Sequence, residues 1–250
     1  MSKDMYLMQH GFISDIEDEE FEDFAHDSFE EILHSFMHEK IKIYRSRMTD
    51  EPIVTEAVIQ NDITDNPEFA YMRTLLVRED LNLQCGNYIE REDGTIWLVP
   101  YLPGTNGIFK KVYIWFCNFT VRFLSSVTGK IVAYPAHTEN ATRYNSGERE
   151  YTQMLIGTSQ HVVYVPNNEE TIVINNGNRF LFDANTTHPT AMRVTQVDST
   201  SYAYGYEVNL VRWTMLEDQY NPLTDNAELG VADYKSYNSE PAHEGGSMFG

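Results

Sequence analysis

The spacing of apolar residues changes near residue 40, and this change sets the predicted fold. From about Asp15 to His38, apolar side chains recur every three or four positions, which places them on one face of a helix. After residue 40 the spacing falls to two, and turn dipeptides such as Asp93-Gly94 separate short stretches rich in β-branched and aromatic residues. The sequence therefore predicts a mainly β protein, with a β-barrel or sandwich body and an N-terminal amphipathic helix.

The chain divides by composition into three segments. An acidic helical segment spans 1–40, a β-rich body spans 41–216, and an acidic C-terminal arm spans 217–250. The body is long enough for one large β domain or for two modules divided near residue 125. In the last predicted strand, the even-numbered apolar residues from Tyr202 to Leu210 share one face, which we expect to be buried. The ten stretches with strand composition are 53–60, 70–78, 85–99, 111–123, 130–134, 161–165, 171–174, 179–183, 191–197 and 202–215.

The negative charge of the chain is concentrated at its two ends. The formal net charge is -20, of which residues 1–39 contribute -11, from 12 acidic side chains and one lysine. Residues 217–250 contribute a further -6, which leaves -3 for the body. A protein that binds DNA or RNA tightly needs a basic surface to displace counterions from phosphates. This charge distribution argues against ordinary nucleic-acid binding. Separately, we expect no membrane-spanning segment, because no apolar run reaches about 18 residues.

The motifs of common metal and catalytic sites are missing. His26 and His34 share a helix face, but Ser35 follows His34, so the His-Glu-x-x-His order of a zinc site is absent. The cysteines, Cys85 and Cys117, lie in predicted strands outside any nucleophile motif, and two such free thiols are typical of a reducing compartment. We therefore expect no catalytic residues, no cofactor and no metal.

The glycine-containing loops and the acidic arm also lack ligand-binding patterns. The loop "GTNGIFKK" at 104–111 has no Gly-Lys-Ser/Thr ending to place on a phosphate, and a hairpin turn explains it. Read from Asp218, the arm has Pro222 and Leu223 where a calcium loop needs a ligand and a glycine.

Several stretches, in this order, resemble structural proteins of the neck or head-closure class in tailed phages of Gram-positive hosts. They cover roughly residues 75–235 and leave out the acidic helix. The stretches are "CGNYIEREDGTIWLV" (85–99), "VYIWFCNFTVRF" (112–123), "TGKIVAYPAHTENATRY" (128–144), "NNGNRFLFD" (175–183), "MRVTQVDSTSYAYGYEVNLVRWTM" (192–215) and "EDQYNPLTDNAELGVADY" (217–234).

The resemblance implies a structural subunit of the head-to-tail connection, in the position of the head-closure ring that retains and releases packaged DNA. Its partners would be copies of itself in a ring, a portal or adaptor protein on one side, tail proteins on the other, and double-stranded DNA that passes without tight binding. The protein would be assembled in the host cytoplasm and located in the virion neck. Alternatives are an adaptor, collar or tail-tube subunit, or, outside this class, a carbohydrate-active or receptor-binding β-sandwich protein.

The C-terminal arm is the candidate site of partner contact. Its 217–234 part has five acidic side chains, no lysine or arginine, and scattered large apolar residues that can anchor an extended segment on a neighbouring subunit. The alternative is a tail folded on its own domain. The predicted interface residues are Tyr220, Asn221, Pro222, Leu223, Asp225, Asn226, Leu229 and Tyr234.

Overall fold

The structure, a computed structural model, consists of two compact β units. Unit 1 is formed by the chain up to Arg45 together with Thr49–Phe116, and unit 2 by Ser46–Met48 and the chain from Cys117 onward. The sequence suggested a division near residue 125, whereas the structure divides the chain between Phe116 and Cys117. The residues that the structure describes are 23–35, 38–60, 71–141, 160–182, 189–203 and 209–234.

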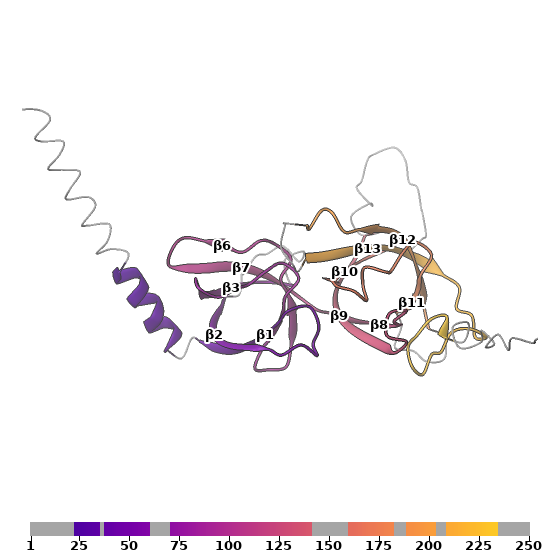
Figure 1. Ribbon diagram of the computed structural model, residues 1–250, viewed down its shortest axis with the longest axis horizontal. Helices are drawn as coiled ribbons and strands as arrows, with labels where there is room; N and C mark the ends of the chain where they lie inside the picture. The colour runs from indigo at the N-terminus through magenta and orange to yellow at the C-terminus, as the bar shows by residue number, and fades with distance from the viewer. Residues whose placement is uncertain are drawn as a thin grey trace, which may run out of the picture. The chain divides into compact units, whose positions relative to one another are not determined.

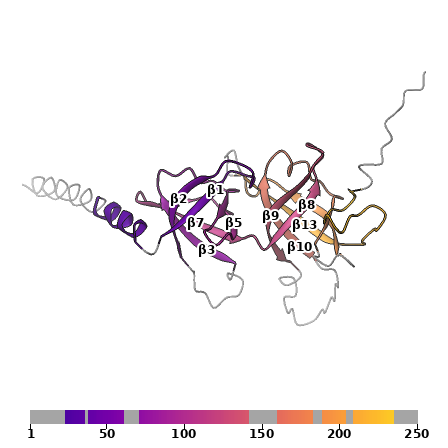
Figure 2. The same ribbon diagram turned by 90° about the horizontal axis from the view of Figure 1, so that it is seen from below.

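Unit 1 is a closed antiparallel barrel. The strands follow the order β3-β2-β1-β4-β5-β7, and the pairing of β3 with β7 closes this sheet into a barrel, while β6 adds to β7 from outside the ring. Figure 2 shows β1, β2, β3, β5 and β7 around the barrel. The strands are β1 (Glu39–Tyr44), β2 (Ile53–Gln60), β3 (Met72–Arg78), β4 (Tyr88–Glu90), β5 (Ile96–Leu98), β6 (Gly104–Thr105) and β7 (Phe109–Phe116).

Alternation along the strands fills the core of unit 1. In β1, Ile41 and Ile43 are buried, and the lysines between and before them are exposed, as the period-two pattern predicts. The β4–β5 hairpin turns at Gly94, whose φ of 78° lies in the left-handed region that glycine adopts without steric cost.

The N-terminal helix packs on the outer face of unit 1. Its described helical residues are 23–33, shorter than the predicted Asp15–His38 because residues 15–22 and 36–37 lie outside the described part. Phe29 and Leu33, one turn apart, are buried against Val58 of β2 and partly buried residues of β3 and β7. The predicted N-terminal helix is therefore confirmed.

Unit 2 is a six-stranded antiparallel sheet that curls until its edge strands meet. The strand order is β11-β12-β13-β10-β9-β8. No strand pairing joins β8 to β11 in the described chain, but these edge strands lie side by side and interact through aromatic rings. The Phe119 and Phe182 rings are 4.5 Å apart, and those of Phe123 and Phe180 are 5.8 Å apart. The strands, coloured from magenta to yellow in Figure 1, are β8 (Phe119–Leu124), β9 (Ile131–Asn140), β10 (Gln160–Asn167), β11 (Arg179–Leu181), β12 (Ala191–Asp198) and β13 (Asn209–Asp218).

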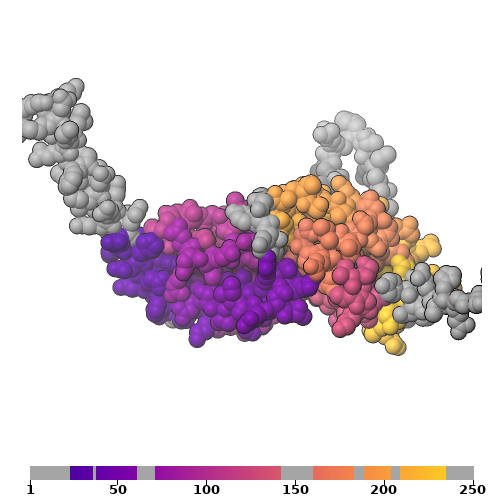
Figure 3. Space-filling view, in the orientation of Figure 1, coloured from indigo at the N-terminus to yellow at the C-terminus, as the bar shows by residue number. Residues whose placement is uncertain are grey.

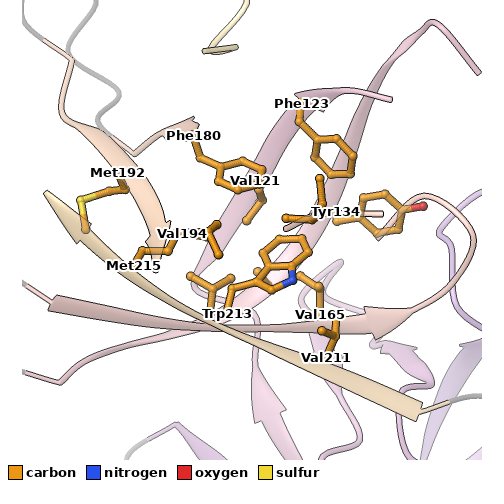
Figure 4. Packing of buried hydrophobic residues seen from close by; sticks show 13 residues of the cluster. Val121, Phe123, Tyr134, Val165, Phe180, Met192, Val194, Val211, Trp213 and Met215 are labelled. Carbon is orange, nitrogen blue, oxygen red and sulfur yellow. The ribbon is translucent and has the colours of Figure 1, made fainter. Parts of the chain in front are cut away.

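A fully buried tryptophan lies at the centre of the unit 2 core. Trp213 stacks on Phe180 with a centroid separation of 5.3 Å, and Val211 and Met215 of the same strand join it in one cluster. Figure 4 shows these side chains converging, while the Tyr134 hydroxyl points away from the cluster. The aromatic rings and Met215 fill the space between facing strands, which makes this core sensitive to truncation.

The mainly β fold with barrel-like sheets confirms the predicted fold class. Most predicted strands are present, but the strand predicted at 171–174 is wrong, because these residues form turns between β10 and β11. Of the predicted buried face in the last strand, Leu210 is buried and Tyr202 half-buried, and residues 204–208 lie outside the described part. Within the described chain, no helix combines the length and the apolar character needed to cross a bilayer.

Candidate functional site

The part of the arm that the structure describes, 217–234, lies on the surface of unit 2. Glu217 and Asp218 complete β13, and the following residues form turns rather than a long extended strand. In Figure 3 this segment is yellow and lies against the orange surface of the same unit. Residues 235–250 of the predicted arm lie outside the described part.

One arginine connects the arm to the barrel. Arg179, on the edge strand β11, donates from Nε to Asp218 Oδ2 at 2.8 Å and from Nη1 to Asp233 Oδ1 at 2.7 Å. Both terminal nitrogens bind Asp225, at 2.9 Å to Oδ1 and 3.0 Å to Oδ2, and Nη2 also donates to the Gln219 carbonyl at 2.5 Å. We call Arg179 with these three aspartates the arginine anchor. A bidentate guanidinium–carboxylate pair is among the stronger and more directional contacts in proteins.

Burial makes the Arg179–Asp225 pair the central contact of the anchor. The Asp225 side chain is 0% exposed and that of Arg179 is 10% exposed, whereas Asp233 is 44% exposed. Asp218 is shared, because Arg193, directly across from Arg179 on β12, also donates to Asp218 Oδ2 at 2.8 Å. The anchor together with Arg193 therefore places two arginines and three carboxylates on one side of unit 2.

The charges in the anchor stabilise one another. Burial alone raises the pKa of Asp225, but hydrogen bonds from the Asp233 and Asn221 amides and from Arg179 outweigh it and lower the pKa below its ordinary value. The pKa of Asp218 is also lowered, because amide and arginine hydrogen bonds outweigh its burial. Burial lowers the pKa of Arg179, but the hydrogen bonds and negative charges of Asp225 and Asp233 outweigh burial and raise this pKa above its ordinary value. Asp225 and Arg179 are therefore both charged at neutral pH.

The arm between Asn221 and Val231 has its own hydrogen-bonded structure. Asp225 Oδ2 accepts from the Asn221 amide at 2.8 Å, and the Asp225 amide donates back to the Asn221 carbonyl at 2.8 Å. Asn226 and Val231 form a two-way backbone bridge at 2.8 and 3.0 Å. Gly230, with φ 68°, allows the turn that closes this bridge. The segment is therefore a compact loop held by its own backbone.

The predicted interface residues separate into two groups. Asp225 is buried in the anchor, Tyr220 packs against Leu181, Ala191 and Ala232, Asn226 accepts from the Leu229 amide, and Tyr234 is half-buried. The exposed residues of the prediction are Asn221, Pro222, Leu223 and Leu229.

Leu223 is 77% exposed, compared with 38% for Leu229. Its amide donates to Asn221 Oδ1 at 3.1 Å, so the turn that presents this leucine is fixed by a side-chain hydrogen bond. Single exposed apolar side chains are common on protein surfaces, and Leu223 stays a candidate contact residue as part of the arm.

Sequence reasoning did not find Arg179. Arg179 lies 39 to 54 positions before the aspartates that it binds, and only the pairing of β11, β12 and β13 brings them together. A usable signal was present: Arg179 and Arg193 lie in two strand-like stretches, and the arm that follows carries acids with no basic residue. Like charges on adjacent strands need nearby opposite charge.

A cavity of about 540 Å³ lies beside the anchor. It opens where β8 and β11 meet without backbone pairing, and Asp233 of the arm forms part of its wall. Within the described chain, no group of three His, Cys, Asp or Glu side chains is placed to hold a metal ion. The lining residues are Phe123, Leu124, Ser126, Val173, Ile174, Asn178, Arg179, Phe180, Ala232 and Asp233.

A second buried polar cluster stabilises another part of unit 2. Glu170, 5% exposed, accepts from the Tyr134 hydroxyl at 2.5 Å and from Thr128 at 3.2 Å, and Arg47 lies 3.8 Å away. Burial, together with the hydrogen bond to Glu170, raises the pKa of Tyr134 to about 12. These contacts tie the 46–48 segment to unit 2, and we assign them a structural role.

Comparisons with known proteins assign no family to the chain. No protein-family model and no curated protein matches the chain. Among solved structures, the chain is similar to "MrkH, A novel c-di-GMP dependence transcription regulatory factor", at 9% identity over 80% of this chain and 85% of that chain. The TM-score of 0.23 does not indicate a shared overall fold.

Proposed function

We propose that the chain is a structural subunit of the head-to-tail connection of a tailed phage, in the position of the head-closure ring. The observation that carries this proposal is the acidic arm, a compact loop that Arg179 binds at the surface of a β-barrel and that presents Leu223 to solvent. The ordered series of sequence stretches that resembles neck proteins supports the same class. Under this proposal the protein acts through assembly geometry and has no catalytic step.

The placement of charge suits a ring that surrounds DNA. Duplex DNA carries about one negative charge per 1.7 Å of its axis, so a lining rich in lysine and arginine would hold it tightly. Residues 1–39 and 217–250 together contribute -17 of the net charge of -20, and repeating them around a ring multiplies their field. Acidic termini near the channel would repel DNA and let it pass.

Electron microscopy of an assembled particle tests the proposal. A tag inserted at the Asp93-Gly94 turn of unit 1 is the natural label, because this turn is far in sequence from the arm. The expected result is labelled density at the vertex between portal and tail. Density in the tail tube would favour the tail-tube alternative, and absence of the chain from virions would refute the whole class.

Binding to duplex DNA gives an independent check. A purified assembly should show little binding at physiological salt, because neither acidic end releases counterions from phosphate. Tight, salt-sensitive binding would contradict the repulsive role of the termini.

The cavity beside the anchor favours one second candidate, a receptor- or carbohydrate-binding module. Ligand sites combine apolar walls with a few polar groups, and this cavity has Phe123 and Phe180 beside Asn178 and Arg179. Screening the full chain against immobilised glycans tests this candidate. A specific hit that Asn178→Ala abolishes would support it over the connector.

A further inference from the structure

We propose that the arginine anchor of one copy receives the arm of a second copy, so that copies become linked by exchange of residues 219–234. The inference rests on the proposed function in that copies must assemble, and it names the partner of the arm as a second copy of this chain. The site and its ligand are both present in unit 2, where the arm of the same chain occupies the site.

The first support is that the arm can move as one piece. The turn at Asn221 and the Asn226–Val231 bridge use hydrogen bonds within the arm, and these remain when the arm leaves its own barrel. A preformed loop binds with less loss of conformational entropy than an unstructured segment does. The arm therefore suits exchange better than a flexible tail would.

The second support is the division of charges across the anchor. Arg179 keeps its contact with Asp218, because Asp218 lies in β13 and outside the exchanged residues 219–234, whereas Asp225 and Asp233 lie in the exchanged part. If the arm leaves, Asp225 and Asp233 lose their contacts with Arg179, and Arg179 keeps only Asp218 as an ion-pair partner. The arm of another copy restores the same contacts, since it carries the same aspartates at the same spacing.

The third support is the small apolar contact between the arm and its barrel. Tyr220 and Ala232 pack on Leu181 and Ala191, and Val231 is fully buried, so the arm docks through a few apolar side chains together with the ion pairs. The exchange of identical elements keeps every contact made in the single chain. Gln219 and Tyr220, between the strand and the loop, are the residues that would change direction.

Concentration decides which form is populated. A segment attached to its own site has an effective concentration on the order of 1 mM, so dilute chains keep the arm on their own barrel. In a ring, the arm of the adjacent copy is also tethered near the site, so it competes with the arm of the same chain. Exchange is thus expected in the ring and disfavoured in the free subunit.

Two full-length variants, each unable to dock its own arm, test the proposal. Arg179→Gln has an intact arm and a weakened site, whereas Asp225→Asn with Asp233→Asn has an intact site and a weakened arm. Loss of a buried charge partner weakens docking roughly 100-fold or more, so the intact arm should occupy the intact site of the other chain at about 100 μM. Native mass spectrometry of the mixture should show a heterodimer, whereas each variant alone should stay monomeric.

The matched control removes the intact arm from the mixture. A triple variant, Arg179→Gln with Asp225→Asn and Asp233→Asn, should form no heterodimer with the double variant. Circular dichroism checks folding, and Arg179→Lys, which keeps the charge but loses the bidentate fork, replaces Arg179→Gln if that variant is unfolded.

Arm exchange would be overturned if folded variants, with either substitution at residue 179, formed no heterodimer. That result leaves the proposed function standing if electron microscopy still places the chain in the neck. Conversely, a heterodimer from chains that are absent from the neck would support exchange and refute the proposed function.

Discussion

Replacing Arg179 with methionine should release the arm while leaving the barrel folded. Methionine keeps much of the side-chain length but leaves Asp225, 0% exposed, without its counter-charge. Breaking one side of a buried ion pair costs about 3–5 kcal/mol. Asp233 is 44% exposed, and its exposed pair contributes at most about 1 kcal/mol. The loss therefore falls mainly on the Asp225 contact, and it exceeds what a surface ion pair supplies.

Hydrogen exchange followed by mass spectrometry measures this loss directly. For peptides from residues 219–234, protection should fall about 100- to 4,000-fold, since about 1.4 kcal/mol corresponds to a factor of ten. Arg193→Met is the matched control, because Arg193 is 53% exposed and its pairing with Asp218 should contribute less than about 1 kcal/mol. Equal protection in the Arg179 variant and the wild type would refute the anchor, as would equal effects of the two substitutions.

Three further predictions concern pH, backbone conformation and helix docking. Because the pKa of Asp225 is lowered in the docked arm, its charge stabilises docking fully above the unfolded pKa of about 3.9. This stabilisation should be lost as the pH falls from about 3.9 toward the lower pKa of the folded state. Hydrogen-exchange protection of residues 219–234 should therefore fall in this acidic range and should not change between pH 6 and 8. Gly230→Ala should destabilise the arm by roughly 1–2 kcal/mol, because alanine is strained at φ 68°, whereas Gly104→Ala, outside the left-handed region, should change urea stability by less than about 0.5 kcal/mol. Leu33→Ala, at a site with no solvent exposure, should weaken packing of the helix by about 2–5 kcal/mol, measured by hydrogen exchange of residues 23–33. Ile32→Ala, at a side chain that is 42% exposed, should weaken it by less than about 1 kcal/mol. Similar losses from both substitutions would contradict the observed burial.

The fold class could be predicted from sequence because it depends on local spacing. Alternation in Ile41 and Ile43 and the turn at Asp93-Gly94 each require only a few neighbouring residues to interpret. The wrong strand at 171–174 has the apolar, β-branched composition of a strand, but its backbone closes in turns, with Thr171 Oγ1 donating to the Pro166 carbonyl at 2.7 Å. Composition alone could not show that this hydroxyl is satisfied by a turn rather than exposed on a strand.

The arginine anchor could not be predicted because it depends on strand order. The acidic character of the arm was evident, and so were its candidate contact residues, but their counter-charge on β11 becomes a neighbour only after β12 and β13 pair. The boundary between the units was similarly hidden. β7 ends at Phe116 and β8 begins at Phe119, so the two strands read as one apolar stretch although they belong to different barrels.

The unpaired seam between β8 and β11 gives the two barrels different physical characters. Unit 1 closes through backbone hydrogen bonds between β3 and β7, whereas unit 2 closes through stacked phenylalanines such as Phe119 and Phe182. Attraction between apolar rings weakens on cooling, and peptide hydrogen bonds do not share that dependence to the same degree. Low temperature should therefore loosen unit 2 first at the seam between β8 and β11. The arm should be the first segment to lose protection when this seam opens, because its Asp233 lines the cavity there.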